Sequence, residues 1–316
     1  MNKVVKLITF NCAKNAANRV GMLVNEKKVF DLTKAGKYHA SLPTVGADML
    51  GLIASSNGNE AVGILKQLLD KGIPDEDLSN IVDISLKAPI PVPHRNVLCV
   101  GKNYLDHVAE VAAVHAKNDG LGTPAPVELP KYAQFFTKAP QTVVGNNDNV
   151  EAHAAVTRVL DYEVELAVII GKKGRDISKA NALSHVFGYT VANDITARDV
   201  QKKHNQWFKG KSLDTTCPLG PCIVPASQLN ATDLAIKMWI NGEMRQDSRT
   251  SNMIFDIPAL IEQLSAGFTL YPGDIILTGT PHGVGFAMKP PQVLKPGDLM
   301  EAEIEGIGRL SNRVIA

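Results

Sequence analysis

The chain has 316 residues, 45% of them hydrophobic and 21% charged, which suits one large domain or a main domain with a smaller one attached. Its 33 basic residues nearly balance 32 acidic ones, and this balance excludes the basic field that holds a nucleic acid or an anionic membrane. No run of about 18 apolar residues could span a membrane, and no signal-peptide pattern opens the chain. We therefore expect a cytoplasmic protein that binds neither nucleic acid nor membrane.

Residues 1–92 are predicted to form a small N-terminal domain, and residues 93–316 a catalytic domain. The segment 88–93 has three alternating prolines, which favour a stiff, extended chain, and it is the best linker candidate. The N-terminal part is predicted to hold strands at 4–10 and 20–31 and a helix at 59–69.

Beyond residue 93, predicted strands outnumber predicted helices. Helices are expected at 105–113 and 257–266, and the Gly- and Pro-rich stretch 118–130 predicts a loop. The expected strands are 96–100, 163–170, 186–191, 222–224, 234–240, 275–278 and 300–304. Because strands and helices do not alternate regularly, the pattern favours a mainly β fold with some α (α+β) over a βαβ array.

Two acids stand at the start of a very apolar run. Glu163 and Glu165 are two residues apart in a predicted strand, so their side chains share a face. Adjacent carboxylates beside a core repel each other and lose hydration, so they need a cation, a shared proton or open solvent. An exposed strand face is the alternative at this point.

A third acid, Asp194, follows the next apolar strand. Three carboxylates without a partnering His or Cys suit Mg²⁺, Mn²⁺ or Ca²⁺ better than zinc. Asp199 could be a fourth acid, although a local structural role fits it better. The four cysteines (12, 99, 217 and 222) lack zinc-site spacing and are expected to be reduced.

His107 and Glu110 lie three residues apart, on one face of the predicted helix. A glutamate can hold an imidazole in one tautomer and raise its basicity, while the imidazole exchanges a proton with water or substrate. An ordinary surface pair is the alternative. Lys211 and Arg198 could each fix a carboxylate, or form an ordinary salt bridge.

Several motifs, in order over residues 95–313, resemble the fumarylacetoacetate hydrolase family, and the leading unit resembles the small domain of many bacterial members. They are the segments 101–110, 161–171, 188–194, 196–201, 210–212, 217–221, 278–285 and 306–308. The resemblance implies a mixed β-roll catalytic domain, usually in a homodimer.

The resemblance also implies roles for individual residues. Metal ligands to Mg²⁺ or Mn²⁺ would be Glu163, Glu165 and Asp194. The acid/base dyad would be His107 and Glu110 on a lid, with Lys211 as the active-site lysine. Positions that contact the substrate or the metal-bound water would be Arg198, Gln201, Thr280 and, less directly matched, Lys138.

Family membership leaves several reactions open on a small 2-oxo carboxylate. We favour metal-dependent hydrolysis of a C–C bond in an acylpyruvate-type 2-oxo acid, through an enolate that the metal stabilises. Isomerisation of a 5-carboxymethyl-2-hydroxymuconate-type acid and decarboxylation of oxaloacetate are alternatives on the same site. A non-catalytic metal-binding protein is a further alternative, which the complete set of site residues argues against.

Overall fold

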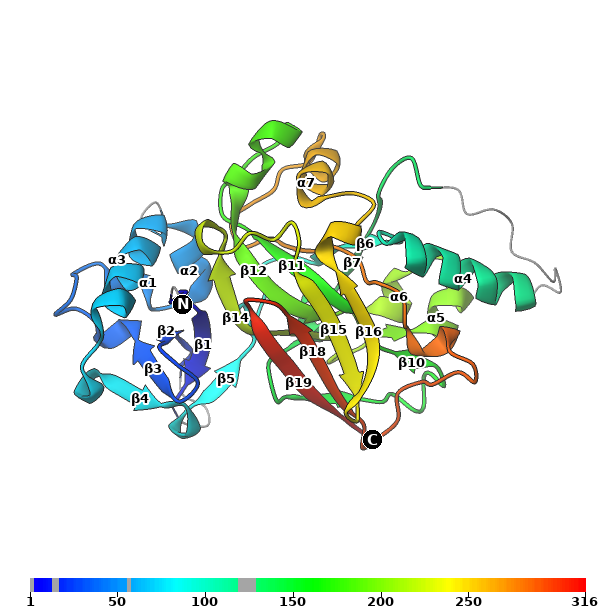
Figure 1. The fold of residues 1–316 in the computed structure, drawn as a ribbon, viewed down its shortest axis with the longest axis horizontal. Helices are drawn as coiled ribbons and strands as arrows, with labels where there is room; N and C mark the ends of the chain where they lie inside the picture. Colours follow the sequence, from blue (N-terminus) through cyan, green and yellow to red (C-terminus); the bar gives the residue numbers. More distant parts are fainter. Residues whose placement is uncertain (1–2, 13–16, 56–57, 119–128) are drawn as a thin grey trace.

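The computed structural model describes residues 3–12, 17–55, 58–118 and 129–316, which form a smaller N-terminal lobe and a larger one (Figure 1). The main sheet has twelve strands: β1 (Leu7–Asn11), β2 (Arg19–Leu23), β3 (Lys28–Asp31), β4 (Leu78–Asn80), β5 (Ser85–Lys87), β6 (Val97–Gly101), β7 (Gln134–Lys138), β8 (Val143–Val144), β11 (Val164–Ile170), β12 (Val186–Asn193), β14 (Cys217–Pro225) and β17 (Ile275–Leu277). Their order is β4-β3-β2-β1-β14-β12-β11-β17-β6-β7, with β5 on β1 and β8 on β14.

The main sheet continues from one lobe into the other, because β1 pairs antiparallel with β14. The predicted linker is packed, since Ala88 and Ile90 are buried and the carbonyl of Pro89 accepts a hydrogen bond from the Thr9 hydroxyl. A domain boundary between residues 92 and 93 stays a prediction.

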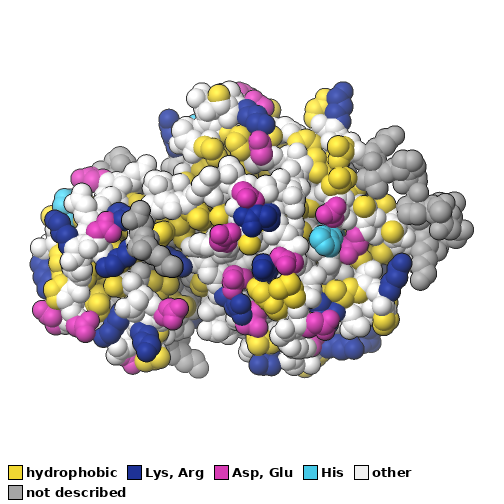
Figure 2. Space-filling model, viewed as in Figure 1, with side chains coloured by type: hydrophobic (Ala, Val, Ile, Leu, Met, Phe, Trp, Pro, Cys, Tyr) yellow, Lys and Arg dark blue, Asp and Glu magenta, His cyan; other side chains and the backbone are white. Residues whose placement is uncertain are grey.

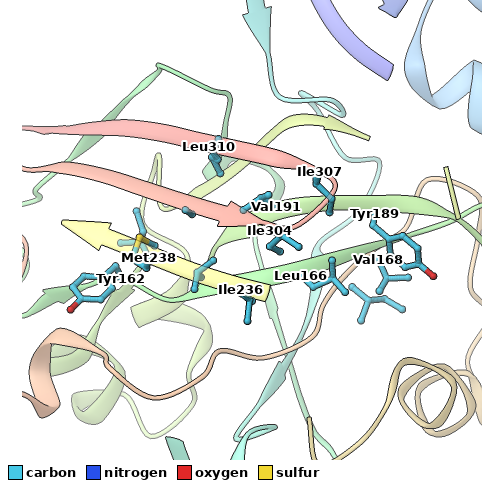
Figure 3. Packing of buried hydrophobic residues seen from close by; sticks show 14 of the residues in the cluster. Tyr162, Leu166, Val168, Tyr189, Val191, Ile236, Met238, Ile304, Ile307 and Leu310 are labelled. Carbon is cyan, nitrogen blue, oxygen red and sulfur yellow. The ribbon is translucent and has the colours of Figure 1, made fainter. Parts of the chain in front are cut away.

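A second sheet packs on the part of the main sheet that lies in the larger lobe. It contains β9 (Asn149–Glu151), β15 (Ala235–Ile240), β16 (Glu243–Arg249), β18 (Leu299–Ile304) and β19 (Gly308–Ile315), in the order β16-β15-β18-β19-β9. A short pair joins β10 (Leu160–Asp161) to β13 (Thr196–Ala197). Between the two large sheets, Leu166 and Val191 belong to the same buried cluster as Ile236 and Ile304 (Figure 3). Buried and half-buried residues alternate in β15, as a one-faced strand requires.

The central strand β11 is buried on both faces. Leu166 and Val168 belong to the core between the sheets, whereas Ala167 and Ile169 belong to a second core that extends to the N-terminal helices. Double burial explains its unbroken apolar run. Glu163 and Glu165 share the face of Ala167, so their side chains point away from the second sheet.

Seven α-helices lie in the described ranges, and none of them is long and apolar enough to cross a membrane. They are α1 (Leu42–Val45), α2 (Met49–Ala54), α3 (Gly58–Lys71), α4 (Leu105–Asn118), α5 (Arg198–Lys203), α6 (Phe208–Lys211) and α7 (Ile257–Ser265). α4 is longer than the predicted 105–113, and most of the predicted loop that follows, residues 119–128, lies outside the described residues. α7 begins after Asp256, whose carboxylate accepts a hydrogen bond from Ala259 N at 2.9 Å.

The prediction of a mainly β, α+β fold is confirmed. Charges of both signs are interspersed on the face shown in Figure 2.

Removing a side chain from the core between the sheets should destabilise the protein strongly. Leu166 is fully buried there, so Leu166→Ala should lower the free energy of unfolding by about 2–5 kcal/mol. Leu183→Ala is the matched control, because Leu183 is 48% exposed and its truncation leaves no buried cavity. Chemical denaturation measures both, and equal losses in the two variants would contradict the assigned core.

Candidate active site

A cavity of about 530 Å³ opens in the larger lobe, where α4, α5 and α6 lie together (Figure 1). Charged and polar residues form part of its wall, and apolar side chains of α4, together with Phe136, Trp207 and Phe286, form the rest. Of the residues predicted from the sequence, the cavity is lined by His107, Glu163, Glu165, Arg198, Gln201, Lys211 and Thr280.

Three acids predicted as metal ligands converge at this cavity: Glu163 and Glu165 line it, and Asp194 lies next to them without lining it. Glu163, Glu165 and Asp194 each offer one carboxylate oxygen, and these oxygens lie within 4.8 Å of one another. The antiparallel β11–β12 pair brings them together, since Asp194 N donates to the Glu163 carbonyl at 2.8 Å. The Asn193 side-chain oxygen accepts from Glu163 N at 3.0 Å and fixes the strand end. All three acids are buried, which rules out the exposed-face alternative.

Two lysines neutralise part of this charge. Lys211 Nζ bridges the carboxylates of Glu163 at 2.7 Å and Asp194 at 2.6 Å. Lys138 Nζ lies 2.9 Å from Asp194 Oδ1 and donates to the carbonyl of Ile195 at 3.0 Å. Lys138 does not line the cavity; it is fully buried and fixes Asp194 in place through this ion pair.

Opposing effects set the protonation of this cluster. Burial disfavours the charged form of Lys211, but Asp194 and Glu163 outweigh it and raise the pKa above its usual value. Lys211 therefore stays an ammonium and acts as a fixed cation rather than a base. Burial alone would raise the pKa of Glu163, yet Lys211 and Arg198 lower it to about 2.

Glu165 differs from the other two acids. In the described ranges, its carboxylate has no cationic side chain within ion-pair distance, and it accepts one hydrogen bond, from Gly279 N at 2.6 Å. Burial, with the charges of Asp194 and Glu163, raises the pKa of Glu165 well above its usual value. A further positive charge is therefore missing at this carboxylate.

The donor set fits a divalent cation. Asp194 Oδ1, although close to Lys138, has no hydrogen bond with a described residue, so it keeps a lone pair for a ligand. Carboxylate oxygens without sulfur or imidazole are the donors that Mg²⁺ and Mn²⁺ prefer. Glu163, Glu165 and Asp194 are the residues that would hold such an ion.

The predicted dyad is only partly assembled. His107 Nδ1 lies 3.5 Å from Glu110 Oε2, beyond the length of a hydrogen bond, and it has no partner among the described residues. The Glu110 carboxylate instead accepts from Gly283 N, at 3.0 and 3.2 Å. Glu110 thus attaches α4 to the loop of residues 279–288 and holds His107 at the cavity wall.

Thr280 is oriented by a residue that the sequence did not indicate. Gln246, on β16, is fully buried and donates to Thr280 Oγ1 at 2.8 Å and to the Pro281 carbonyl at 2.8 Å. Its side-chain oxygen accepts from Val164 N at 3.0 Å, next to the metal-site acids. Gln246 thereby links the second sheet to the site.

Asp161 was also missed as a site residue, although it opens one of the matching motifs. It is fully buried, and its carboxylate accepts from Arg198 Nε at 2.9 Å and from Gly285 N at 2.8 Å. Arg198 Nη1 lies 2.6 Å from Glu163 Oε1, and its guanidinium lies over the Phe286 ring, 4.4 Å from the ring centroid. Asp161 therefore connects the 279–288 loop to the acid cluster through Arg198.

Asp161→Asn tests this connection. The amide keeps the shape but loses a charged acceptor, so Arg198 loses one of its two ion-pair partners and the free energy of unfolding should fall by about 1–3 kcal/mol. Asp233→Asn is the matched control, because Asp233 forms an exposed pair with Arg249 and should change little. Thermal and chemical denaturation compare the two, and an Asp161→Asn variant as stable as the control would refute the role.

Comparison with known proteins agrees with this geometry. Residues 96–315 match the family model described as fumarylacetoacetate (FAA) hydrolase C-terminal. The chain is 46% identical over 301 residues to the oxaloacetate tautomerase YisK of Bacillus subtilis, covering 93% of this chain and 95% of the relative.

Two solved structures are similar along most of the chain. A fumarylacetoacetate hydrolase from Exiguobacterium antarcticum matches with a TM-score of 0.76 and 38% identity, over 99% of both chains. A 5-carboxymethyl-2-hydroxymuconate delta-isomerase from Mycobacterium smegmatis matches with a TM-score of 0.62 and 37% identity, over 75% of this chain and 82% of that one. The chain is therefore an enzyme of the fumarylacetoacetate hydrolase family, as its motifs predicted.

Proposed function

We propose that this enzyme interconverts the enol and keto forms of a small 2-oxo acid of the oxaloacetate type. The similarity that carries the proposal is the 46% identity, over 93% of this chain, to an oxaloacetate tautomerase. The cavity supports it, because an imidazole faces an acid cluster suited to a divalent cation.

The reaction moves one proton and breaks no carbon–carbon bond. The enol hydroxyl gives up its proton, its electron pair forms the 2-oxo group, and the C2–C3 double bond takes a proton at C3. His107 is the described cavity residue suited to carry this proton, because an imidazole can both accept and donate a proton. Glu110 positions it by its attachment to Gly283.

Fixed charges in the cavity suit the carboxylate end of such a substrate. Arg198 lines the cavity, and its guanidinium, which Asp161 and Glu163 hold in place, offers a permanent positive charge to a substrate carboxylate. Lys211 adds a permanent positive charge, and Thr280, held by Gln246, adds a hydroxyl. A divalent cation at Glu163, Glu165 and Asp194 would supply Lewis-acid stabilisation of negative charge on the 2-oxo oxygen.

Hydrolysis of an acylpyruvate, which the sequence favoured, stays a prediction. Tautomerisation uses the same acid cluster and the same proton carrier but requires no activated water. The similarity to a tautomerase over nearly the whole chain is the reason to prefer it.

Replacing His107 by Ala should remove the proton carrier and leave the acid cluster intact. Tautomerisation of oxaloacetate should slow by roughly 10²–10⁴-fold, the usual reach of general acid–base catalysis. The decay of enol ultraviolet absorbance measures the rate, and His39→Ala, at an exposed histidine, is the control. Undiminished turnover in His107→Ala would remove this residue from the mechanism, and an inactive wild-type enzyme would refute the tautomerase proposal.

Glu165→Gln should weaken the metal site selectively. Removing the divalent metal with a chelating agent should abolish tautomerisation by the wild-type protein. Adding back Mg²⁺ or Mn²⁺ should restore it. Calorimetric titration with Mn²⁺ should show affinity reduced by at least about tenfold in Glu165→Gln, since even outer-shell changes at metal sites cost 10–100-fold. Glu76→Gln, at an exposed acid, should bind Mn²⁺ like wild type. Equal Mn²⁺ affinity in all three proteins would contradict the assignment of this ligand.

A further inference from the structure

Lys102 has an unusual backbone at the cavity wall. It lines the cavity, and its φ of 57° lies in the left-handed region, which costs free energy for a residue with a side chain. Such conformations persist where the surroundings determine them, and they cluster at functional sites.

Both neighbours of Lys102 hold this backbone in place. At Gly101, a Cβ atom would lie 2.2 Å from the Trp207 ring, so this position packs directly under the indole. Asn103 is fully buried, donates to the carbonyl of Thr278 at 2.8 Å and accepts from Phe255 N at 2.8 Å. Two fixed neighbours therefore present the Lys102 side chain to the cavity.

The charge of Lys102 is uncommitted. Four cationic residues line the cavity, and two of them, Arg198 and Lys211, are paired with buried acids. Lys102 forms no ion pair or hydrogen bond with any residue in the described ranges, and it is exposed to solvent. Lys202 is also uncommitted there, but it lies on the helix α5 without a comparable backbone constraint.

We propose that Lys102 binds the distal carboxylate of a dicarboxylic 2-oxo acid and so selects diacids over monoacids. The inference rests on the proposed function, in that a 2-oxo acid is taken as the ligand of the cavity. With the 2-oxo carboxylate end at Arg198 and the acid cluster, a second carboxylate in the same cavity needs a cation that is not already paired. Lys102 supplies it.

Inert analogues test this binding without catalysis. Malate has a distal carboxylate, and 2-hydroxybutanoate has a methyl group in its place. In calorimetry on the Mn²⁺-loaded protein, Lys102→Met should weaken malate binding by at least about tenfold, the usual loss for a hydrogen bond between charged groups. It should leave 2-hydroxybutanoate binding unchanged, and Lys102→Arg should retain most of the preference for malate.

Two variants separate this contact from other effects. Lys203→Met removes an exposed charge of α5 that does not line the cavity, and it should bind both analogues like wild type. Lys102→Gly relieves the backbone constraint, so it should unfold at the wild-type temperature or above it while losing the preference for malate.

Several results would overturn the proposal. One is a Lys102→Met variant that binds both analogues equally more weakly, or binds malate as tightly as the wild type. Another is a Lys203→Met variant that loses as much malate affinity as Lys102→Met does. A wild-type protein without preference for malate would do the same. Failure of the proposed function is recognised separately, because a wild-type enzyme that prefers malate but leaves enol-oxaloacetate unchanged refutes the tautomerase and not the diacid site.

Discussion

A shortage of positive charge at the ends of β11 and β12 is the constraint on which the rest of the site depends. Four acids are buried there, Asp161, Glu163, Glu165 and Asp194, and within the described ranges three cationic side chains pair with them: Arg198, Lys138 and Lys211. Without a bound cation, burial and the excess of negative charge favour a proton on Glu165, whose pKa is raised well above its usual value. A divalent cation would replace that proton, so folding prepares the site for the metal.

The fold places these charges by ordinary sheet geometry. β11 is buried on both faces, and its antiparallel pairing with β12 sets Asp194 against the Glu163 backbone. The second sheet contributes Gln246, which reaches the loop carrying Thr280. The helix α4 and the loop of residues 279–288 are attached to this frame, since Glu110 holds α4 to Gly283 and Asp161 holds the same loop at Gly285. The three acids on the sheet and His107 on α4 together define where a substrate can lie.

Local patterns in the sequence predicted much of this arrangement. The two-residue spacing of Glu163 and Glu165 in an apolar run predicted a shared face, and the buried triad agrees with it. Asp161 and Gln246 were not predicted as site residues. Their hydrogen-bond partners lie 37 and 34 residues away in the sequence, and no local periodicity indicates them. β16 was missed since an edge strand of polar sequence shows no apolar alternation. β14 was predicted too short because three of its nine residues are prolines.

The most direct test of the account is a crystal structure of the protein grown with Mn²⁺, with anomalous diffraction data. The charge shortage predicts one strong anomalous peak bounded by carboxylate oxygens of Glu163, Glu165 and Asp194, at distances of about 2.0–2.2 Å, as octahedral oxygen sites require. A peak elsewhere, or no peak between these three acids at saturating Mn²⁺, would contradict it.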